Sequence, residues 1–483
     1  MTIASGRNFI GGRWIDTQDT IEDIDPGNGE VVGVLARGSA ADVDAAVEAA
    51  RRAAPDWAAM AASTRGAILR TAADDLEQQA DEWARLMTRE MGKPYPEARV
   101  ECVRAAAILR FFAGEPHRPF GEHYESDQAQ TWLFTRRHPI GVVGIITPWN
   151  FPAAIPTWKL APALVFGNTA VIKLADDAAL TGLRLIEALV AAGLPDGVVN
   201  VVVGRGAEVG AAIVEHPGVN AVSFTGSTET GRGILEKASR SAKRVQLEMG
   251  GHNPVIVRAD AALDKAVAAV ALGAFASAGQ KCTATRRVYV ARGLYDEFTD
   301  RLVSRASGMK IGHGLDEGTE MGPLVNEVQL QGVLDALERA EKQGTLRTGG
   351  KRLSDGELER GSYMGPAVLT DLPHDAEFAC EEVFGPAVAV WPVDDDDEAV
   401  ELANRTQYDL SASIFTRDLD VAKRFVEEIR AGIVHVNSQT AGAEVHVPFG
   451  GLSGSGYGPH EQGRAAREFY TESKTVYLDP AGS

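Results

Sequence analysis

Five short apolar runs rich in β-branched residues alternate with longer helix-like stretches in the middle of the chain. The runs are residues 142–146, 170–173, 198–203, 221–224 and 245–247, and the stretches between them are about 15 to 25 residues long. This alternation is typical of βαβ units, in which parallel strands form a sheet with helices on both faces. The pattern therefore predicts the α/β fold class.

A second α/β region is predicted from Pro254 to about Asn437, with strands that include residues 288–290 and 387–390. Together with the first region, it indicates that the chain is large enough for more than one domain.

The segments outside these regions are predicted to be helical near the N-terminus and extended elsewhere. Ser39 can cap an Ala-rich run over residues 41–52, and Ser63 can cap a second run, so two or three helices are expected there. Residues 131–137 have an extended pattern, and we predict a hairpin that leaves the body of the protein. The tail, residues 468–478, is also predicted to be extended.

The composition excludes several classes of protein. The chain has 483 residues, of which 45% are hydrophobic and 24% charged, and its formal net charge is −19. Because the basic residues are scattered, nucleic acid and anionic membranes are not expected partners. The longest nearly apolar stretch, residues 266–279, is shorter than the roughly 20 residues of a membrane span, and residues 1–14 lack the apolar core of a signal peptide. The acidic run 394–398 is typical of a solvated loop or helix start.

The cysteine count indicates a reducing compartment. The three cysteines, Cys102, Cys282 and Cys380, are far apart and show no CxxC spacing, which excludes a disulfide framework and a zinc site. We therefore expect a cytoplasmic protein without a bound metal.

Cys282, in the sequence GQKCT, is the strongest candidate nucleophile. Its neighbours are polar, and the adjacent Lys281 would favour the reactive thiolate over the thiol, whose ordinary pKa is about 8.5. The alternative is a small buried hydrophobic residue. Cys102 and Cys380 lack this polar setting, and we expect them to be structural.

Glu248 is a candidate general base. It follows an apolar strand and precedes Gly250 and Gly251, which allow another molecule or backbone to approach closely. A desolvated glutamate with a raised pKa is an effective base near neutrality. The alternative is a buried ion pair.

Two strand-to-helix junctions carry further candidate groups. In residues 147–152 (TPWNFP), the Asn150 amide can face developing negative charge, although an ordinary helix cap is equally compatible. In residues 224–231 (FTGSTETG), glycines precede a helix N-terminus that could bind an anion. The chain contains no Walker A sequence, so nucleotide hydrolysis is not supported.

Taken in order, these motifs resemble those of the aldehyde dehydrogenase superfamily. The matching segments are TPWNFP, FTGSTETG, LEMGG (247–251), GQKC (279–282) and EEVFGP (381–386), and the resemblance covers essentially the whole chain. It implies a variant Rossmann NAD-binding domain, an α/β catalytic domain and a small β arm for oligomerisation. The corresponding residues are 1–117 and 141–250, then 251–450, then 118–140 with 463–483.

An arm of this kind exposes a strand edge, which pairing with another subunit covers. The resemblance therefore implies a homodimer or homotetramer.

The resemblance also implies the catalytic roles. Cys282 would attack the aldehyde carbonyl, and the Asn150 amide with the Cys282 N–H would hold the oxyanion. Glu248 would activate the water that hydrolyses the thioester, which favours the hydrolytic branch because the CoA-acylating branch lacks this glutamate. Lys159 and Glu461 would relay protons, although the segment around Glu461 carries one residue more than the usual pattern.

The implied cofactor is NAD, with NADP less favoured. Three places after Lys173, where NAD-preferring members have Glu, this chain has Asp176, whose carboxylate would accept from the ribose 2′-OH and repel a 2′-phosphate. Asp is shorter than Glu, and Leu174 replaces the usual proline. The other implied cofactor contacts are Thr147, Trp149, Gly206, Gly226, Ser227, Glu382 and Phe384.

The substrate remains open between two alternatives. Residues 440–449 and 456–463 (GYGPHEQG) look like those of 2-oxoglutarate-semialdehyde (2,5-dioxovalerate) dehydrogenases, and Lys281 could pair with the carboxylate at the far end of such a semialdehyde. An implied pocket of Phe151, Trp158 and Phe449 would equally suit an aromatic or aliphatic aldehyde. A third, remote alternative is an inactive binding or structural relative.

Overall fold

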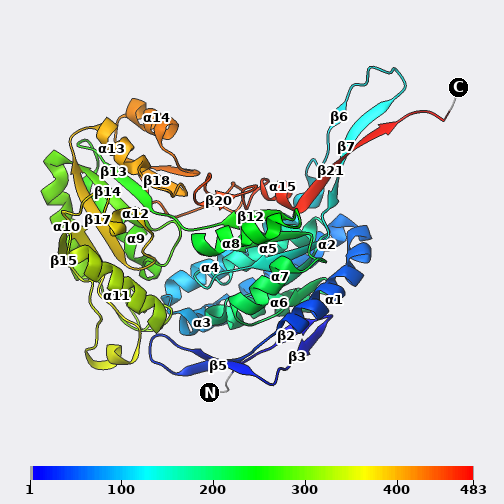
Figure 1. Cartoon of the computed structure of the whole chain (residues 1–483), viewed down its shortest axis with the longest axis horizontal. Coiled ribbons are helices and arrows are strands. Elements are labelled where there is room, and N and C mark those ends of the chain that lie inside the picture. Colours follow the sequence, from blue (N-terminus) through cyan, green and yellow to red (C-terminus); the bar gives the residue numbers. More distant parts are fainter. Residues whose placement is uncertain (1–3, 482–483) are drawn as a thin grey trace.

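Two large sheets and a projecting arm make up the part of the chain that this computed structural model describes, residues 4–481 (Figure 1). An eight-stranded sheet forms one lobe, a seven-stranded sheet forms the other, and a three-stranded sheet leaves the body. A further small sheet joins β1 (Ala4–Gly6), β5 (Val31–Ala36) and β4 (Thr20–Ile24). The predicted α/β fold class is confirmed.

The eight-stranded sheet has the strand order β20-β12-β11-β8-β9-β10-β2-β3. Its five central strands are parallel, and every residue of the four strands from β11 to β10 is buried because helices cover both faces. The central strands are β8 (Val142–Ile146), β9 (Thr169–Lys173), β10 (Val199–Val201), β11 (Ala221–Thr225) and β12 (Arg244–Glu248). Each lies within two residues of a predicted run. The antiparallel edge strands, β20 (Gly456–Tyr457), β2 (Asn8–Ile10) and β3 (Arg13–Ile15), were not predicted.

Helices pack on both faces of this sheet and form two separate hydrophobic cores. One face carries α1 (Ala40–Ala59), α7 (Ala211–Glu215) and α8 (Thr228–Ser239). The other carries α5 (Ala154–Val165) and α6 (Ala179–Ala191), with α2 (Ala62–Gln78), α3 (Ala80–Met91) and α4 (Tyr95–Ala113) packed behind them.

The N-terminal helices differ from the prediction in number and in one boundary. Four helices, rather than two or three, fill this region. Ser39 precedes α1 as predicted, and its backbone N–H donates to the Asp42 carboxylate over 2.8 Å. The predicted capping role of Ser63 is wrong. Ser63 lies inside α2, because the N–H of Arg65 donates to the Ala61 carbonyl (3.2 Å) and closes a first turn that begins earlier.

The seven-stranded sheet has the order β15-β16-β17-β14-β13-β18-β19, and only β15 is antiparallel. Its strands are β13 (Asn253–Val257), β14 (Thr285–Ala291), β15 (Thr345–Thr348), β16 (Ala367–Thr370), β17 (Ala387–Val393), β18 (Ser411–Phe415) and β19 (Ile433–Val436). Its helices are α9 (Leu263–Phe275), α10 (Tyr295–Ser307), α11 (Glu327–Glu341), α12 (Glu377–Cys380), α13 (Asp396–Asn404) and α14 (Leu419–Glu428). The predicted second α/β region is confirmed, and the acidic run opens α13 as expected.

The arm contains β6 (His123–Tyr124), β7 (Trp132–Pro139) and the C-terminal strand β21 (Thr471–Leu478), which project together from the body (Figure 1). The predicted hairpin is confirmed. The tail was only partly predicted, because α15 (Ala466–Tyr470) precedes β21 where an extended segment was expected. The helical turn is closed by the Thr471 hydroxyl, which donates to the Arg467 carbonyl over 2.7 Å.

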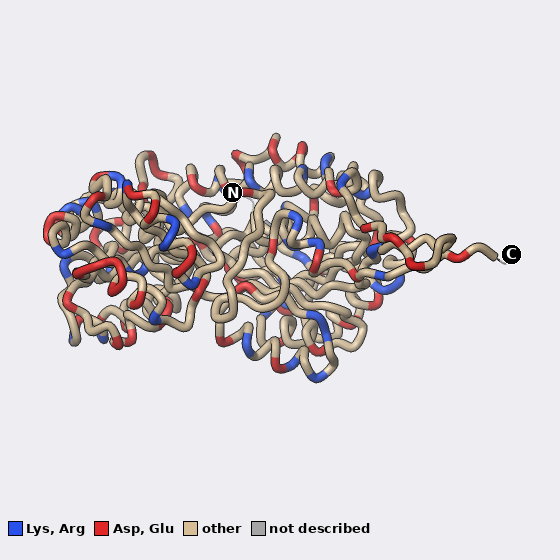
Figure 2. Tube along the Cα trace, turned by 90° about the horizontal axis from the view of Figure 1, so that it is seen from above, with Lys and Arg blue, Asp and Glu red and all other residues tan. Residues whose placement is uncertain are grey.

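Charged residues of both signs are interspersed over both lobes (Figure 2). Among the helices within residues 4–481, none combines the length and the apolar composition that a bilayer crossing requires. The three cysteines are free thiols.

Candidate active site

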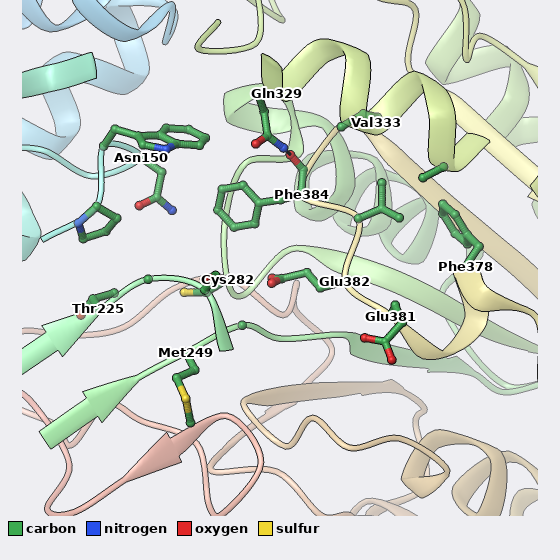
Figure 3. Close-up of a pocket in the computed structure, with 18 of the residues that line it drawn as sticks. Asn150, Thr225, Met249, Cys282, Gln329, Val333, Phe378, Glu381, Glu382 and Phe384 are labelled. Atoms are coloured by element: carbon green, nitrogen blue, oxygen red, sulfur yellow. Dashed lines mark hydrogen bonds between the residues drawn. The ribbon is translucent and has the colours of Figure 1, made fainter. Parts of the chain in front are cut away.

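The candidate site lies where the strand order of the eight-stranded sheet reverses. From β8 the chain continues to β9 and β10 on one side, and then to β11 and β12 on the other. Ligands of open α/β sheets bind at the carboxyl ends of the strands at such a switch point. A cavity of about 450 Å³ occupies this position, and residues of both lobes line it, among them Asn150 and Ser227 from one lobe and Cys282, Glu382 and Phe384 from the other (Figure 3).

An unusual backbone turn presents Cys282 to this cavity. The three residues Ser277, Ala278 and Gly279 all have left-handed φ values, 55°, 50° and 66°. Such conformations cost energy for residues with a side chain and persist where neighbours enforce them. Here the buried Arg286 guanidinium donates to the carbonyl of Gly279 and to that of Gly385 in the neighbouring loop. The nucleophile loop is therefore held rigidly before any ligand binds.

The surroundings of Cys282 favour the thiol over the thiolate. Burial, followed by the nearby Glu382 and Glu248 carboxyl groups, raises the pKa of Cys282 to about 12. The Lys281 ammonium donates to the Leu272 carbonyl in α9 (3.2 Å), so its effect on the Cys282 thiolate stays a prediction. Burial also lowers the pKa of Lys281 to about 8.

Asn150 follows β8 and faces the cavity (Figure 3). One N–H of its amide donates to the Gln280 carbonyl (3.0 Å), which fixes the side chain beside the nucleophile loop and leaves the second N–H free. The alternative role as a helix cap does not apply, because the Glu101 carboxylate accepts from the N–H groups of Ala153 and Ala154 at the start of α5.

Glu248 ends β12 and is 3% exposed. Its Oε2 has no hydrogen-bond partner in the described part of the chain, and no cation lies within ion-pair distance of it there. Burial and the negative charge of Glu461 raise the pKa of Glu248 well above its ordinary value. The alternative of a buried ion pair is therefore wrong for Glu248, and its carboxyl group is available for proton transfer.

The predicted relay pair does form a buried ion pair. Lys159, on α5, contacts the Glu461 carboxylate and donates to the Ser223 hydroxyl over 2.9 Å. Lys159 is completely buried and Glu461 is 2% exposed. The Lys159–Glu461 pair acts electrostatically on Glu248, since both members contribute to its pKa shift.

Five of the predicted cofactor residues line the cavity: Trp149, Gly226, Ser227, Glu382 and Phe384. Ser227 caps α8, and the first turn of a helix leaves N–H groups that can bind phosphate oxygens. The Glu382 carboxyl group accepts from the Gly251 N–H (3.0 Å), and burial raises its pKa to about 7. Trp149 and Phe384 meet edge to face across the cavity, with ring centroids 5.5 Å apart. Polar and aromatic groups of this kind fit a dinucleotide.

The other predicted cofactor residues lie at the same sheet edge, outside the lining of this cavity. Lys173 ends β9 and pairs with the Asp176 carboxylate over 3.3 Å. Thr147 follows β8, and its N–H donates to the Lys173 carbonyl. Gly206 opens the turn that leads into α7.

The predicted aromatic pocket residues are Phe151, which follows Asn150, Trp158, which lies on α5, and Phe449. Trp158 and Phe449 have ring centroids 5.4 Å apart, and the Lys93 ammonium lies 4.0 Å from the centroid of the Phe151 ring. Lys281 is not among the residues that line the cavity beside Cys282.

Sequence reasoning missed Asp409, which holds the loop beside Glu248. Its carboxylate accepts from four consecutive backbone N–H groups, those of residues 452–455. This loop follows Gly450, where an added Cβ would come within 2.5 Å of Glu248 Oε1. The Gly- and Ser-rich run 450–456 could have been recognised as a loop that needs a side-chain acceptor.

Comparison with known proteins identifies the family. The family model described as "Aldehyde dehydrogenase family" matches residues 14–476. The chain belongs to the aldehyde dehydrogenase family. It is 44% identical to an alpha-ketoglutaric semialdehyde dehydrogenase of Bacillus subtilis over 98% of both chains, and 44% identical to an alpha-ketoglutarate semialdehyde dehydrogenase of Haloferax volcanii with the same coverage.

Solved structures of the aldehyde dehydrogenase fold superpose closely on this chain. A betaine aldehyde dehydrogenase from Staphylococcus aureus in complex with NAD⁺ is 33% identical, with a TM-score of 0.96 over 99% of this chain and 95% of that one. A structure described as an E. coli NADP dependent enzyme is 38% identical, with a TM-score of 0.95 over 99% and 98%.

Proposed function

We propose that this aldehyde dehydrogenase oxidises a semialdehyde to the corresponding acid with NAD, through a covalent intermediate on Cys282. The observation that carries the proposal is that Cys282 and Asn150 line one cavity at the switch point of the sheet, while the buried, unpaired Glu248 is near enough to Cys282 to raise the pKa of its thiol. A nucleophile, an oxyanion donor and a general base are the three groups that acyl transfer requires.

The proposed reaction begins when the Cys282 thiol gives its proton to solvent water and Sγ forms a bond to the aldehyde carbon, which moves the carbonyl π electron pair onto oxygen. The oxyanion accepts hydrogen bonds from the free N–H of the Asn150 amide and from the Cys282 backbone N–H. When bound, NAD supplies the acceptor for the hydride that leaves this carbon. The thioester that remains on Cys282 is attacked by water, Glu248 takes the proton of that water, and the carbon–sulfur bond breaks to release the acid and the cysteine.

The high pKa values of Cys282 and Glu248 place a condition on this mechanism. The raised pKa values favour the protonated form of each group, and each must lose its proton before it acts. We assign the buried Lys159–Glu461 pair to the relay of the Glu248 proton; both its members act electrostatically on the Glu248 carboxyl group.

NAD rather than NADP is supported by Asp176 at the end of the Lys173 strand. A carboxylate there repels a 2′-phosphate, whereas Lys173 alone would attract one. The relatives include proteins described with either cofactor, so residue 176 is the position that we assign to this choice.

A semialdehyde is supported by the names of two 44%-identical relatives, both alpha-ketoglutarate semialdehyde dehydrogenases. An apolar aldehyde is the second candidate, because Phe151, Trp158 and Phe449 would suit an uncharged chain.

We assign cofactor binding to residues 1–117 and 141–250, catalysis to residues 251–450, and oligomerisation to residues 118–140 with 463–483. The exposed apolar side chains of Trp132 and Tyr477 on the arm support a homodimer or homotetramer. The three free thiols support a cytoplasmic location.

Initial rates over a panel of aldehydes, each with NAD and with NADP, test the proposal. We expect the highest kcat/KM for 2,5-dioxopentanoate with NAD. If uncharged aliphatic or aromatic aldehydes exceed every semialdehyde, the second candidate replaces the first, and if no aldehyde is oxidised with either cofactor, the proposed function is wrong.

A further inference from the structure

We propose that Arg104, with Gln462 and the Trp158 indole N–H, binds the carboxylate end of the semialdehyde substrate. This inference rests on the proposed function and names the residues that would select a charged substrate over an apolar one. The other cations described above have partners of their own: Lys281 donates to the Leu272 carbonyl, and Lys93 and Lys159 pair with Glu101 and Glu461.

Arg104 is a partly buried guanidinium without an ion-pair partner. It lies on α4, one turn after Glu101. The Glu101 carboxylate caps the start of α5, so Arg104 lies beside the next turns of α5. No carboxylate within residues 4–481 lies within 4.0 Å of its side-chain nitrogens. Its hydrogen bonds go instead to two neutral acceptors, the Ala443 carbonyl and the Gln462 Oε1 (3.2 Å). A desolvated cation with neutral partners favours an anionic ligand.

Gln462 is completely buried and is held in a strained backbone conformation, with φ of 59°. Because its Oε1 accepts from Arg104, its Nε2 must be the donor end, and this donor has no acceptor in the described part of the chain. Leaving a buried donor without an acceptor costs about 1–3 kcal/mol. The strain and the unused donor together indicate a position kept for a ligand.

Trp158, in the predicted aromatic pocket, supplies a second unused donor. Its side chain is 7% exposed, and its Nε1 has no acceptor among the described residues. The Trp158 ring packs against Phe449, and the backbone of Phe449 pairs in both directions with Glu461, the residue before Gln462 (2.8 Å each). Phe449 therefore connects Trp158 to the segment that carries Gln462, at the aromatic pocket predicted for the substrate.

The cluster of Arg104, Gln462 and Trp158 has more hydrogen-bond donors than acceptors. An aldehyde with an apolar tail offers no acceptor there, whereas a carboxylate offers two oxygens and a neighbouring 2-oxo group offers a third. The Glu444 and Glu101 carboxylates act on Arg104 only at longer range, so its charge remains available to a substrate. The cluster fits the 2-oxo acid end of 2,5-dioxopentanoate.

The test compares kcat/KM for 2,5-dioxopentanoate and for pentanal, an uncharged aldehyde of the same chain length, in Arg104→Met and Gln462→Glu. The Gln462→Glu variant keeps the size of the side chain and neutralises Arg104, so it remains informative if Arg104→Met folds poorly. Arg99→Met is the matched control, because Arg99 lies on the same helix and pairs with Asp81 at the surface. A second readout is the binding of the product 2-oxoglutarate by calorimetry, without turnover.

We expect the ratio of kcat/KM for the semialdehyde to that for pentanal to fall about tenfold or more in both variants, chiefly through KM. Binding of 2-oxoglutarate should weaken in parallel, and Arg99→Met should keep the wild-type ratio. An unchanged ratio, or equal losses for both substrates, would overturn the inference. Lys281→Met is measured alongside these variants, and a fall of the ratio in Lys281→Met alone would also overturn it. If the wild-type protein oxidises pentanal but no semialdehyde, the proposed substrate fails instead, and no oxidation of any aldehyde refutes the proposed function as a whole.

Discussion

Replacing Glu248 by Gln separates the two halves of the proposed reaction. The substitution keeps the shape of a side chain that is 3% exposed and contacts the Gly450 backbone, so the fold should be retained. It removes the carboxyl group that is assigned to the water step. Because hydride transfer precedes that step, NADH should still form once on each active site.

The expected size of the effect follows from the isolation of the carboxyl group. Two other carboxylates lie near the β12 end, but Glu461 is bound to Lys159 and Glu382 is held by the Gly251 N–H, so neither is free in the way that Glu248 is. A positioned general base contributes about 10²–10⁴-fold to a rate, or about 2.7–5.4 kcal/mol of barrier. The steady-state rate of Glu248→Gln should therefore fall at least about 100-fold, with a full NADH burst before it.

The pH dependence gives an independent check. The pKa of Glu248 is raised well above its ordinary value, so the fraction in the basic form grows as the pH rises through that raised pKa. The deacylation rate of the wild-type enzyme should increase with pH and then level off, and Glu248→Gln should lose this dependence. Stopped-flow absorbance of NADH measures both phases, with the surface variant Glu236→Gln as control. A burst that collapses as strongly as the steady state would refute the assignment and place Glu248 in the activation of Cys282.

Three further substitutions test other parts of the account. Cys282→Ala should abolish oxidation while the thermal unfolding midpoint changes little, because this thiol is only partly buried in a loop held by its neighbours; retained turnover above a tenth of wild type would contradict its role. Asp176→Ala should raise kcat/KM with NADP by about tenfold and narrow the preference for NAD, and equal efficiency with both cofactors in the wild type would contradict the argument. Asp409→Ala should lower the free energy of unfolding by about 3 kcal/mol, because four backbone N–H groups lose their acceptor. The pKa of Asp409 is lowered in the folded protein, so its contribution to the free energy of unfolding is present above the pKa of the unfolded chain and is lost as the pH falls through the pKa of the folded state. Denaturant titrations at pH 7 and pH 3 should therefore show a smaller difference in stability between wild type and variant at pH 3.

The sequence predicted the strands of the first sheet well because burial on both faces leaves an unmistakable apolar signal. β8 to β11 are buried throughout, and the corresponding runs stand out from the polar stretches around them. The edge strands gave no such signal. β20 has only two residues, and it joins the sheet because the Glu248 strand offers an unpaired edge.

The candidate site could be predicted as far as local motifs reach. Cys282 and Asn150 stand in distinctive segments, and the structure brings them to one cavity. The direction of a long side chain depends on tertiary contacts, which is why the sequence did not predict that the Lys281 ammonium donates to the carbonyl of Leu272 in the preceding helix. Arg104 gave no signal, because its partner Gln462 lies 358 residues further along the chain.

The most direct test of the central claim is to trap the acyl group on the enzyme. Glu248→Gln incubated with 2,5-dioxopentanoate and NAD, then acid-quenched and digested, should yield a peptide in which Cys282 carries the substrate acyl group as a thioester, at close to one group per chain. Peptide mass spectrometry locates that group. Full oxidation of the aldehyde with an unmodified Cys282, or with the acyl group on Cys380 instead, would contradict the account.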